Sequence, residues 1–148
     1  MLKQTEILAA VIKLLKDKLK MPIYADEIQE GFKTPCLFVK LVKRVDTETI
    51  NFNACQLSII ITYMASAQKS REIEFLGMVD DIYMLFGLGF KIVDRYLPTK
   101  TITSERIGEK QDILQVTLTY EYLDSTDRPS PEYDLIEKLN VNEKLRAD

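Results

Sequence analysis

The residues of this chain that could do chemistry are few and do not cluster. The 148 residues include no histidine, which removes the commonest general base and a frequent metal ligand. Cys36 and Cys55 are too far apart for the closely spaced pairs of a zinc site. Gly87 and Gly89 lack the third glycine and the lysine–serine ending of a phosphate loop. We therefore expect no catalytic, cofactor-binding or metal-binding residues, although tyrosine, lysine and carboxylates leave catalysis open in principle.

Carboxylates lie close together at two places. Asp80 and Asp81 fall in a predicted helix, where adjacent residues point in different directions, so a shared acid–base site is not expected. Asp26, Glu27 and Glu30 could hold a cation, but their spacing is not that of a calcium loop. The favoured interpretation of this acidic cluster is solvated surface or a protein interface.

Positive charge gives only a weak signal for nucleic-acid binding. Lys43 and Arg44 could contact phosphate near a turn, but the net charge is -3 and no exposed aromatic residues are interleaved with them. Residues 1–44 carry nine basic and five acidic side chains, whereas residues 121–148 carry four basic and eight acidic ones. These are either two ordinary solvated surfaces or surfaces that attract each other, within one chain or between copies.

Composition favours one globular domain. Hydrophobic residues make up 46% of the chain and charged residues 29%, and no apolar run approaches the ~20 residues needed to span a bilayer. Lysines interrupt the apolar N-terminal segment, so it does not read as a signal peptide, and we expect the chain to stay in the cytoplasm. Both cysteines lie in apolar, strand-like runs, which favours buried free thiols over a Cys36–Cys55 disulfide.

Periodicity places a helix and a hairpin in the first half of the chain. Apolar residues recur at helical spacing over residues 5–20, with Thr5 as the expected cap. This basic amphipathic helix either covers a sheet, which we favour, or lies on a membrane. A short strand at 23–24 precedes an antiparallel hairpin of strands 36–45 and 50–64, with a turn near 46–49. The expected apolar face of the helix consists of Leu8, Val11, Ile12, Leu15 and Leu19.

The second half begins with a helix over residues 70–86. Mid-helix Gly77 suggests a close approach to the sheet. Strands are expected at 90–93, 100–107 and 113–123. The apolar face of this helix is expected to consist of Leu76, Val79, Tyr83 and Phe86, widened by Ile73, Phe75 and Ile82.

The predicted fold class is α+β. We expect a mostly antiparallel or mixed sheet of about four to five strands packed by two helices, forming a domain over residues 1–124. Residues 125–148 would add a linker and an extra C-terminal helix or tail, either partly ordered against a partner or frayed.

One stretch carries a family resemblance. In IYADEIQEGFKTPCLFVKLV, the spacing of Tyr24, Glu27, Gly31, Pro35 and Phe38 after an N-terminal helix resembles the tail terminator (tail completion) proteins of tailed bacteriophages. The strand LQVTLTYEYL near the end of the domain also fits. The likeness is to the small version found in phages, prophages and phage-tail-like bacteriocins of low-GC Gram-positive bacteria, and it covers residues 1 to about 124.

The resemblance implies a structural protein and not an enzyme. Such proteins form a ring, usually of six copies, on the last ring of the tail tube, where they stop polymerisation and offer a surface for head–tail joining. The implied partners are other copies of the chain, the tail tube protein with or without a sheath, and the head-completion protein. No membrane and no sequence-specific nucleic acid is implied, although DNA passes through the ring. The implied location is the virion tail or a tail-like particle, assembled in the bacterial host cytoplasm.

Two alternatives stay open. One is another head–tail connector, stopper or tail assembly factor, and the other is a small α+β enzyme or regulator. The segment 26–34 and the turn at 46–49 are the expected partner contacts, with plain surface loops as the competing interpretation. The candidate interface residues are Glu27, Glu30, Phe32, Lys33, Lys43, Arg44, Asp46 and Glu48.

Overall fold

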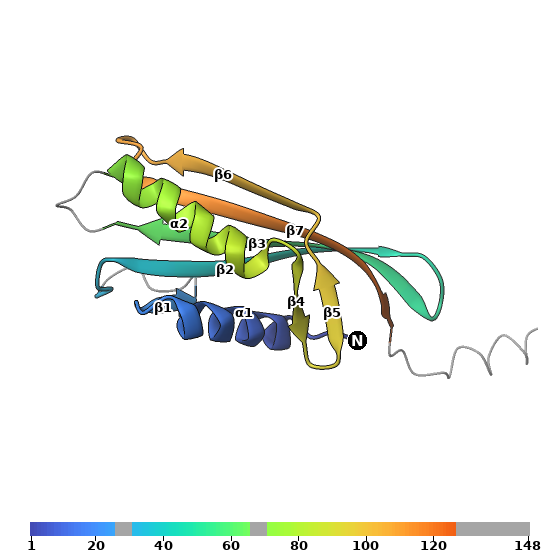
Figure 1. Ribbon diagram of the computed structural model, residues 1–148. Coiled ribbons are helices and arrows are strands. Elements are labelled where there is room, and N and C mark those ends of the chain that lie inside the picture. The colour runs from blue at the N-terminus through green and yellow to red at the C-terminus, as the bar shows by residue number, and fades with distance from the viewer. Residues whose placement is uncertain (26–30, 66–70, 127–148) are drawn as a thin grey trace, which may run out of the picture.

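The chain folds into a five-stranded sheet with two helices and a small second sheet (Figure 1). The computed structural model describes residues 1–25, 31–65 and 71–126. Two helices and seven strands lie in that part of the chain: α1 (Gln4–Lys18), β1 (Ile23–Ala25), β2 (Cys36–Thr47), β3 (Phe52–Met64), α2 (Arg71–Phe86), β4 (Gly89–Ile92), β5 (Arg95–Pro98), β6 (Thr101–Ile107) and β7 (Ile113–Ser125).

The main sheet has the order β1-β2-β3-β7-β6. β1 runs parallel to β2, and every other neighbouring pair is antiparallel, so the sheet is mixed. The predicted α+β class, with two helices on a sheet of four to five strands, is confirmed. The strand predicted at 90–93 corresponds to β4, but the sequence did not predict its partner β5 or the separate β4–β5 hairpin, because four residues are too few to establish a period of two.

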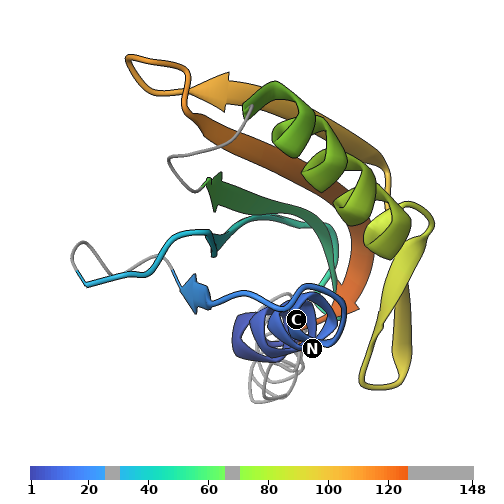
Figure 2. The same ribbon diagram turned by 60° about the vertical axis from the view of Figure 1, so that its left-hand side comes forward.

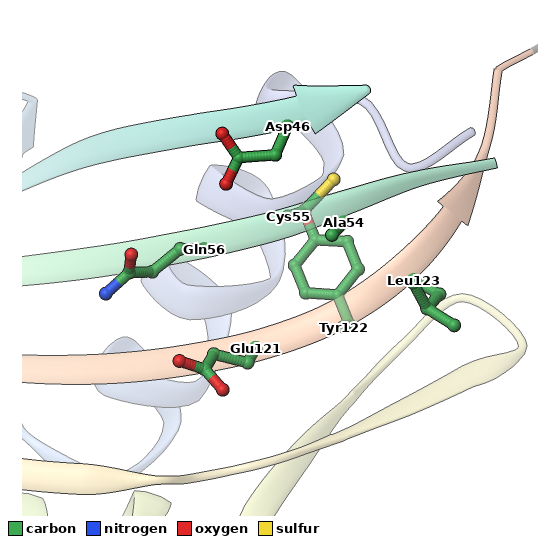
Figure 3. A pocket seen from close by; sticks show the side chains of 7 residues that line it. All are labelled: Asp46, Ala54, Cys55, Gln56, Glu121, Tyr122 and Leu123. Carbon is green, nitrogen blue, oxygen red and sulfur yellow. The ribbon is translucent and has the colours of Figure 1, made fainter. Parts of the chain in front are cut away.

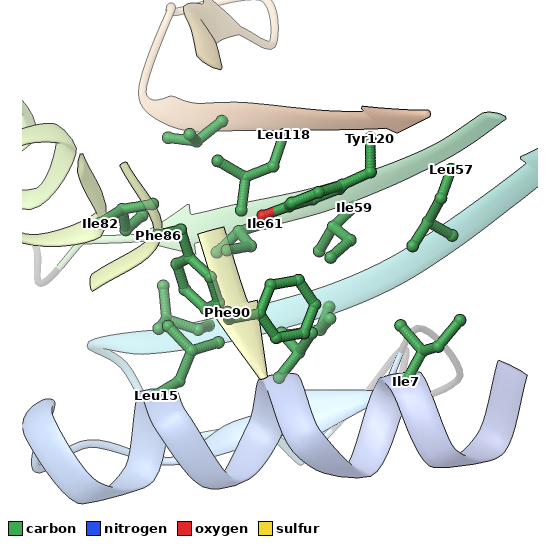
Figure 4. Close-up of a cluster of buried hydrophobic side chains, with 14 of the residues drawn as sticks. Ile7, Leu15, Leu57, Ile59, Ile61, Ile82, Phe86, Phe90, Leu118 and Tyr120 are labelled. Atoms are coloured by element: carbon green, nitrogen blue, oxygen red, sulfur yellow. The ribbon is translucent and has the colours of Figure 1, made fainter. Parts of the chain in front are cut away.

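Both helices pack on one face of this sheet (Figures 1 and 2). Side chains on a strand alternate between faces, and the buried positions of β3 and β7 alternate accordingly. One core cluster joins these positions to residues of both helices and to Phe90 of the β4–β5 hairpin (Figure 4). Phe90 packs edge-on against Phe86 of α2 and against Tyr120 of β7, with ring centroids 5.6 and 5.2 Å apart. The opposite face of the sheet carries no helix in the described residues.

The helix α1 begins earlier than predicted and buries a rotated face. It starts at Gln4 after the N-cap Lys3, so the prediction that Thr5 caps it is wrong. Its fully buried residues are Ile7, Val11 and Leu15. The face assigned to the core from sequence omitted Ile7, because Leu8 and Ile12, which are half-buried, also fit the helical spacing.

The apolar face predicted for α2 is partly wrong, since Phe75, Ile82 and Phe86 are buried as predicted but three other residues are exposed. The residues that reach the core are Phe75, Met78, Ile82 and Phe86. Leu76 and Tyr83 were assigned to the core, yet they are 60% and 58% exposed. Ten of the sixteen residues in this helix are apolar, so spacing alone does not select the buried face.

Gly77 does not approach the sheet, and that prediction is also wrong. A Cβ placed on it would meet nothing within 4 Å. The glycine therefore lies on the outer side of α2.

The β2–β3 hairpin is confirmed, with a later turn than predicted. β2 continues through Asp46 to Thr47, so the turn occupies residues 48–51. Cys36 pairs with Met64, and Cys55 pairs with Val45, which places the two thiols about 30 Å apart along the strands and on opposite faces. Both cysteines are buried and free, as the sequence favoured.

The C-terminal linker over residues 127–131 and the helix or tail over residues 132–146 lie outside the described residues. The predicted domain boundary at residue 124 stays a prediction.

Candidate protein interface

The candidate interface residues lie in two separate regions. Phe32 and Lys33 belong to the segment that leads into β2, whereas Lys43, Arg44 and Asp46 lie on the far half of β2, and Glu48 follows in the turn. Glu27 and Glu30 lie outside the described residues. The sheet does not bring the two groups together, because they sit at opposite ends of β2.

Phe32 is anchored at the β1 edge of the sheet. Its ring packs edge-on against Phe38 of β2, with centroids 5.3 Å apart. Tyr24 of β1 is the register partner of Phe38 on β2, and the centroids of these two rings are 5.6 Å apart. The three rings form an aromatic cluster that holds the segment entering β2, while Lys33 remains exposed.

Lys43 and Arg44 point to opposite faces of the sheet because they are consecutive on a strand. The Lys43 ammonium lies 5.9 Å from the centroid of the Tyr122 ring, on the face that carries the helices. Arg44 forms an exposed ion pair with Asp46 on the other face, with 3.3 Å between Nε and Oδ2. Exposed pairs contribute little to stability, about 0–1 kcal/mol. Lys43 and Arg44 therefore cannot both contact the same phosphate.

The far half of the hairpin extends beyond the rest of the sheet as a three-stranded projection. β6 pairs with β7 only up to Thr119, and β1 pairs with β2 only from Leu37 to Val39. We call the projection the distal arm: residues 42–58 of the β2–β3 hairpin with residues 119–125 of β7 (Figure 1). Five of its large apolar residues are about half exposed or more: Val42, Val45, Ile50, Phe52 and Leu123.

The distal arm carries an open groove of about 370 Å³. Asp46, Gln56 and Glu121 come from three adjacent strands and lie on the face without helices (Figure 3). Both carboxylates are paired with cations: Asp46 with Arg44, and Glu121 with Lys100 at 2.7 Å. The groove is therefore polar with balanced charge, and it is suited to a polar protein surface.

Asp124 ties the arm to the body of the domain. It is the only charged residue in the described core, 5% exposed. Its carboxylate accepts hydrogen bonds from the backbone N–H of Leu2 at 2.8 Å and of Ser125 at 3.0 Å. Arg95 of β5 lies 3.4 Å from the same carboxylate and also donates to the carbonyl of Leu123. One side chain thus joins the start of α1, the small sheet and the end of β7.

The titratable groups with shifted pKa values are buried and neutral, which makes them poor catalysts. Burial raises the pKa of the Cys36 and Cys55 thiols, so both stay protonated at neutral pH. Burial also raises the pKa of Tyr120 to about 12. The pKa of Tyr63 is raised by burial and by its hydrogen bond to Glu74. None of these groups is an activated nucleophile or base.

Within residues 1–25, 31–65 and 71–126, no three His, Cys, Asp or Glu side chains converge as metal ligands. The helices in this same part of the chain are too short or too polar to cross a membrane.

A second surface, on α2, was missed by the sequence analysis. Five large apolar side chains on its outer side and just beyond its end are exposed, and an open groove of about 470 Å³ separates the helix from β6. The available signal was the excess of apolar residues in α2 over what one face can bury. The exposed residues are Ile73, Leu76, Tyr83, Met84 and Leu88.

The fold and these surfaces define a small α+β protein whose described features suit docking to other chains. The sequence matches the family described as phage tail terminator protein over residues 6–132. This chain belongs to that family, whose members are structural phage tail proteins.

One solved structure supports the fold. A chain from the virion of a native gene transfer agent particle aligns with a TM-score of 0.53 and 11% sequence identity, covering 79% of this chain and 92% of its own. A second solved chain, 16% identical over 87% of this chain and 99% of its own, aligns with a TM-score of only 0.45, too low to support a shared fold. No curated protein is significantly similar in sequence.

Proposed function

We propose that this chain forms a ring of identical copies, six in number, on the end of a phage tail tube. The ring stops tube polymerisation and provides the surface on which the head is joined. The observation that carries this proposal is the family membership, which spans residues 6–132 and thus nearly all of the described domain.

The geometry supports a role that depends on surfaces. A subunit of such a ring needs contacts with two neighbouring copies, with the tube and with the head side. The distal arm offers exposed apolar residues and a polar groove, and α2 offers a second apolar surface. Exposed apolar patches on soluble domains are typical of interaction sites. The proposed contacts with partners remain those expected from sequence: Glu27, Glu30, Phe32, Lys33, Lys43, Arg44, Asp46 and Glu48.

The proposed partners follow from this role. They are other copies of the chain, the tail tube protein with or without a sheath, and the head-completion protein. DNA passes through the ring without sequence-specific contacts, and no membrane is involved. Assembly takes place in the host cytoplasm, and the chain catalyses no reaction.

The test is to polymerise the tail tube protein of the same phage with and without this chain. We expect shorter tubes of uniform length, each with a ring at one end, when the chain is present. The measurements are tube lengths and end structures by negative-stain electron microscopy. Unchanged tube lengths and bare ends would overturn the proposal. If the chain leaves tube lengths unchanged but restores the joining of heads to tails, it is instead a head–tail connector.

A matched pair of variants locates the contacts. Arg44→Glu reverses a charge on the open face of the distal arm and should reduce capping, whereas Lys91→Glu reverses an exposed charge on β4 and should not. Equal capping by both variants would remove the arm from the proposed contacts and leave the capping role intact.

A further inference from the structure

The two helices lie at opposite flanks of the same sheet face. α1 contacts β1 and β2, at one edge of the sheet. α2 lies along β6 and β7, at the other edge: Phe75 packs under the guanidinium of Arg106, with 4.8 Å from Cζ to the ring centroid. The grooves beside α2 are lined jointly by this helix and β6. If copies stand side by side in one orientation, with the β6 edge of one toward the β1 edge of the next, α2 of one copy comes next to α1 of the following copy.

The exposed surface of α2 is apolar and acidic. Leu76 is 60% exposed and Met84 74% exposed, about two turns apart on the outer face. The exposed charged side chains described on this helix are all carboxylates: Glu72, Asp80 and Asp81. An apolar helix surface whose own exposed charges are carboxylates is suited to a partner that is apolar and basic.

Gly77 lies in the middle of this surface. Glycine in a helix interior costs about 1 kcal/mol relative to alanine, and here no neighbouring atom of the same chain requires it. One turn on, Asp80 and Asp81 flank the direction in which Gly77 faces. A basic side chain of a partner that approached the glycine would therefore meet carboxylates beside it.

The exposed surface of α1 has the complementary character. Lys13, Lys16 and Lys18 are exposed on its last turns, where Asp17 is the one acidic neighbour. Leu8 and Ile12 are half-buried beside these lysines. The lysine stems are themselves apolar and can cover hydrophobic surface while the ammonium groups reach carboxylates.

We infer that the acidic, apolar outer face of α2 docks the lysine face of α1 from a second copy of this chain. The contact joins two different surfaces, and such heterologous contacts generate a ring where the rotation between neighbouring copies closes. The free edge of β6 offers a different contact, pairing with β6 of another copy, but that contact is isologous and ends with two copies. The α1–α2 contact rests on the proposed ring and names the surfaces through which its subunits meet.

Charge reversal tests the pairing directly. Asp80→Lys with Asp81→Lys makes the α2 face basic, and Lys13→Glu with Lys16→Glu makes the α1 face acidic. Each variant alone places like charges in every contact, so we expect self-association to weaken by about tenfold or more. All four substitutions in one chain restore opposite charges and should restore association.

Mixing the two charge-reversed variants adds a geometric test. Opposite charges then meet only where the two variants alternate, so an equimolar mixture assembles into rings with an even number of copies. The control is Lys91→Glu with Lys110→Glu, which changes the net charge as much as the α1 variant but on exposed positions outside both helices. Far-UV circular dichroism and thermal unfolding of every variant exclude loss of the fold.

Association is measured by sedimentation velocity at low salt and by ring formation on tubes of the tail tube protein. Loss in both single variants, rescue in the combined chain and an unaffected control support the inference. Rings that persist in either charge-reversed variant overturn the inference. Loss of association that the chain with all four substitutions does not restore also overturns it. That second result assigns the α2 face to another occupant, such as the tube or residues 127–148. A wild-type chain that leaves tubes uncapped contradicts the proposed function, whereas capping by every variant contradicts only the α1–α2 contact.

Discussion

Asp124 shows how one side chain holds distant parts of this domain together. Its carboxylate is buried and is balanced by two backbone N–H donors and by Arg95. A buried charge of this kind stabilises a fold only while all its partners stay in place, because its desolvation is costly. Nothing in the local sequence YEYLDS distinguishes it from an exposed carboxylate at the end of a strand.

We predict that Asp124→Ala lowers the free energy of unfolding by roughly 3 kcal/mol, since it leaves the Arg95 charge and two N–H groups without their acceptor. Asp124→Asn keeps an acceptor oxygen and should cost less. Urea unfolding followed by circular dichroism measures both changes. Glu109→Ala, in an exposed turn, is the control and should change stability by less than about 0.5 kcal/mol. A similar small change for Asp124→Ala would contradict this role.

Alkaline pH should unfold the domain through its buried phenols and thiols. Burial raises the pKa of Tyr120 from 10.0 to about 12, and it also raises the pKa of Tyr63 and of Tyr122. A group with a raised pKa in the folded state gives its full stability below the unfolded pKa and loses it as pH rises. We therefore expect constant tyrosine-linked stability up to about pH 10 and a fall of roughly 2–3 kcal/mol from Tyr120 alone by about pH 12.

The measurement is urea unfolding at a series of pH values, with tyrosinate absorbance recorded alongside. Tyr120→Phe should flatten the alkaline fall, whereas Tyr96→Phe, at a 55% exposed position, should not. Ionisation of every tyrosine near pH 10 without unfolding would contradict the assignment.

At the scale of elements, α2 has one side that packs into the core and an opposite side that is free for contacts with other chains. Its inner side reaches the core through Phe75, Met78, Ile82 and Phe86, while its outer side carries a second apolar set with a glycine in the middle. The outer set contributes little to the fold of one copy because it remains exposed.

We predict that Gly77→Ala stabilises the isolated chain by about 0.5–1 kcal/mol, because alanine favours the helix and its Cβ meets nothing within 4 Å. Gly89→Ala is the opposite case. Gly89 has a φ of +139°, and a Cβ there would collide with the Leu97 carbonyl and lie 2.8 Å from Pro98 Cα, so the substitution should destabilise the fold. Thermal unfolding of the two variants gives the comparison. Destabilisation by Gly77→Ala would mean that the outer side of α2 is already packed within one copy.

At the scale of the whole molecule, the distribution of charge matters more than its total. The net charge of -3 is small, yet the exposed lysines of α1 and the exposed carboxylates of α2 lie on opposite flanks of the sheet. Such an arrangement attracts copies in one relative orientation and opposes others.

We predict that association of the wild-type chain weakens as salt rises, because the Debye length falls from about 10 Å at 0.1 M to about 3 Å at 1 M. Sedimentation velocity at several sodium chloride concentrations measures the change. The chain carrying all four charge reversals should show the same salt dependence. Association that strengthens with salt would indicate a contact held by the apolar residues alone.

The amino-acid sequence by itself determined both helices, the strands of the main sheet, the α+β class and the family. Alternation in β3 and β7 is a local property, because one residue in two faces the core, and the absence of histidine is visible without any structure. The resemblance around Tyr24 to Phe38 was sufficient to predict the family that the match over residues 6–132 then established.

Only the tertiary structure decided which helix faces are buried and which surfaces remain free. Two apolar stripes on α2 satisfy the same period, and the choice between them depends on where β6 and β7 lie, which is a long-range property of the sheet. The distal arm likewise arises because β6 stops pairing at Thr119 while β7 continues to Ser125. The packing of both helices on one sheet face placed the lysines of α1 and the carboxylates of α2 at opposite flanks of the sheet.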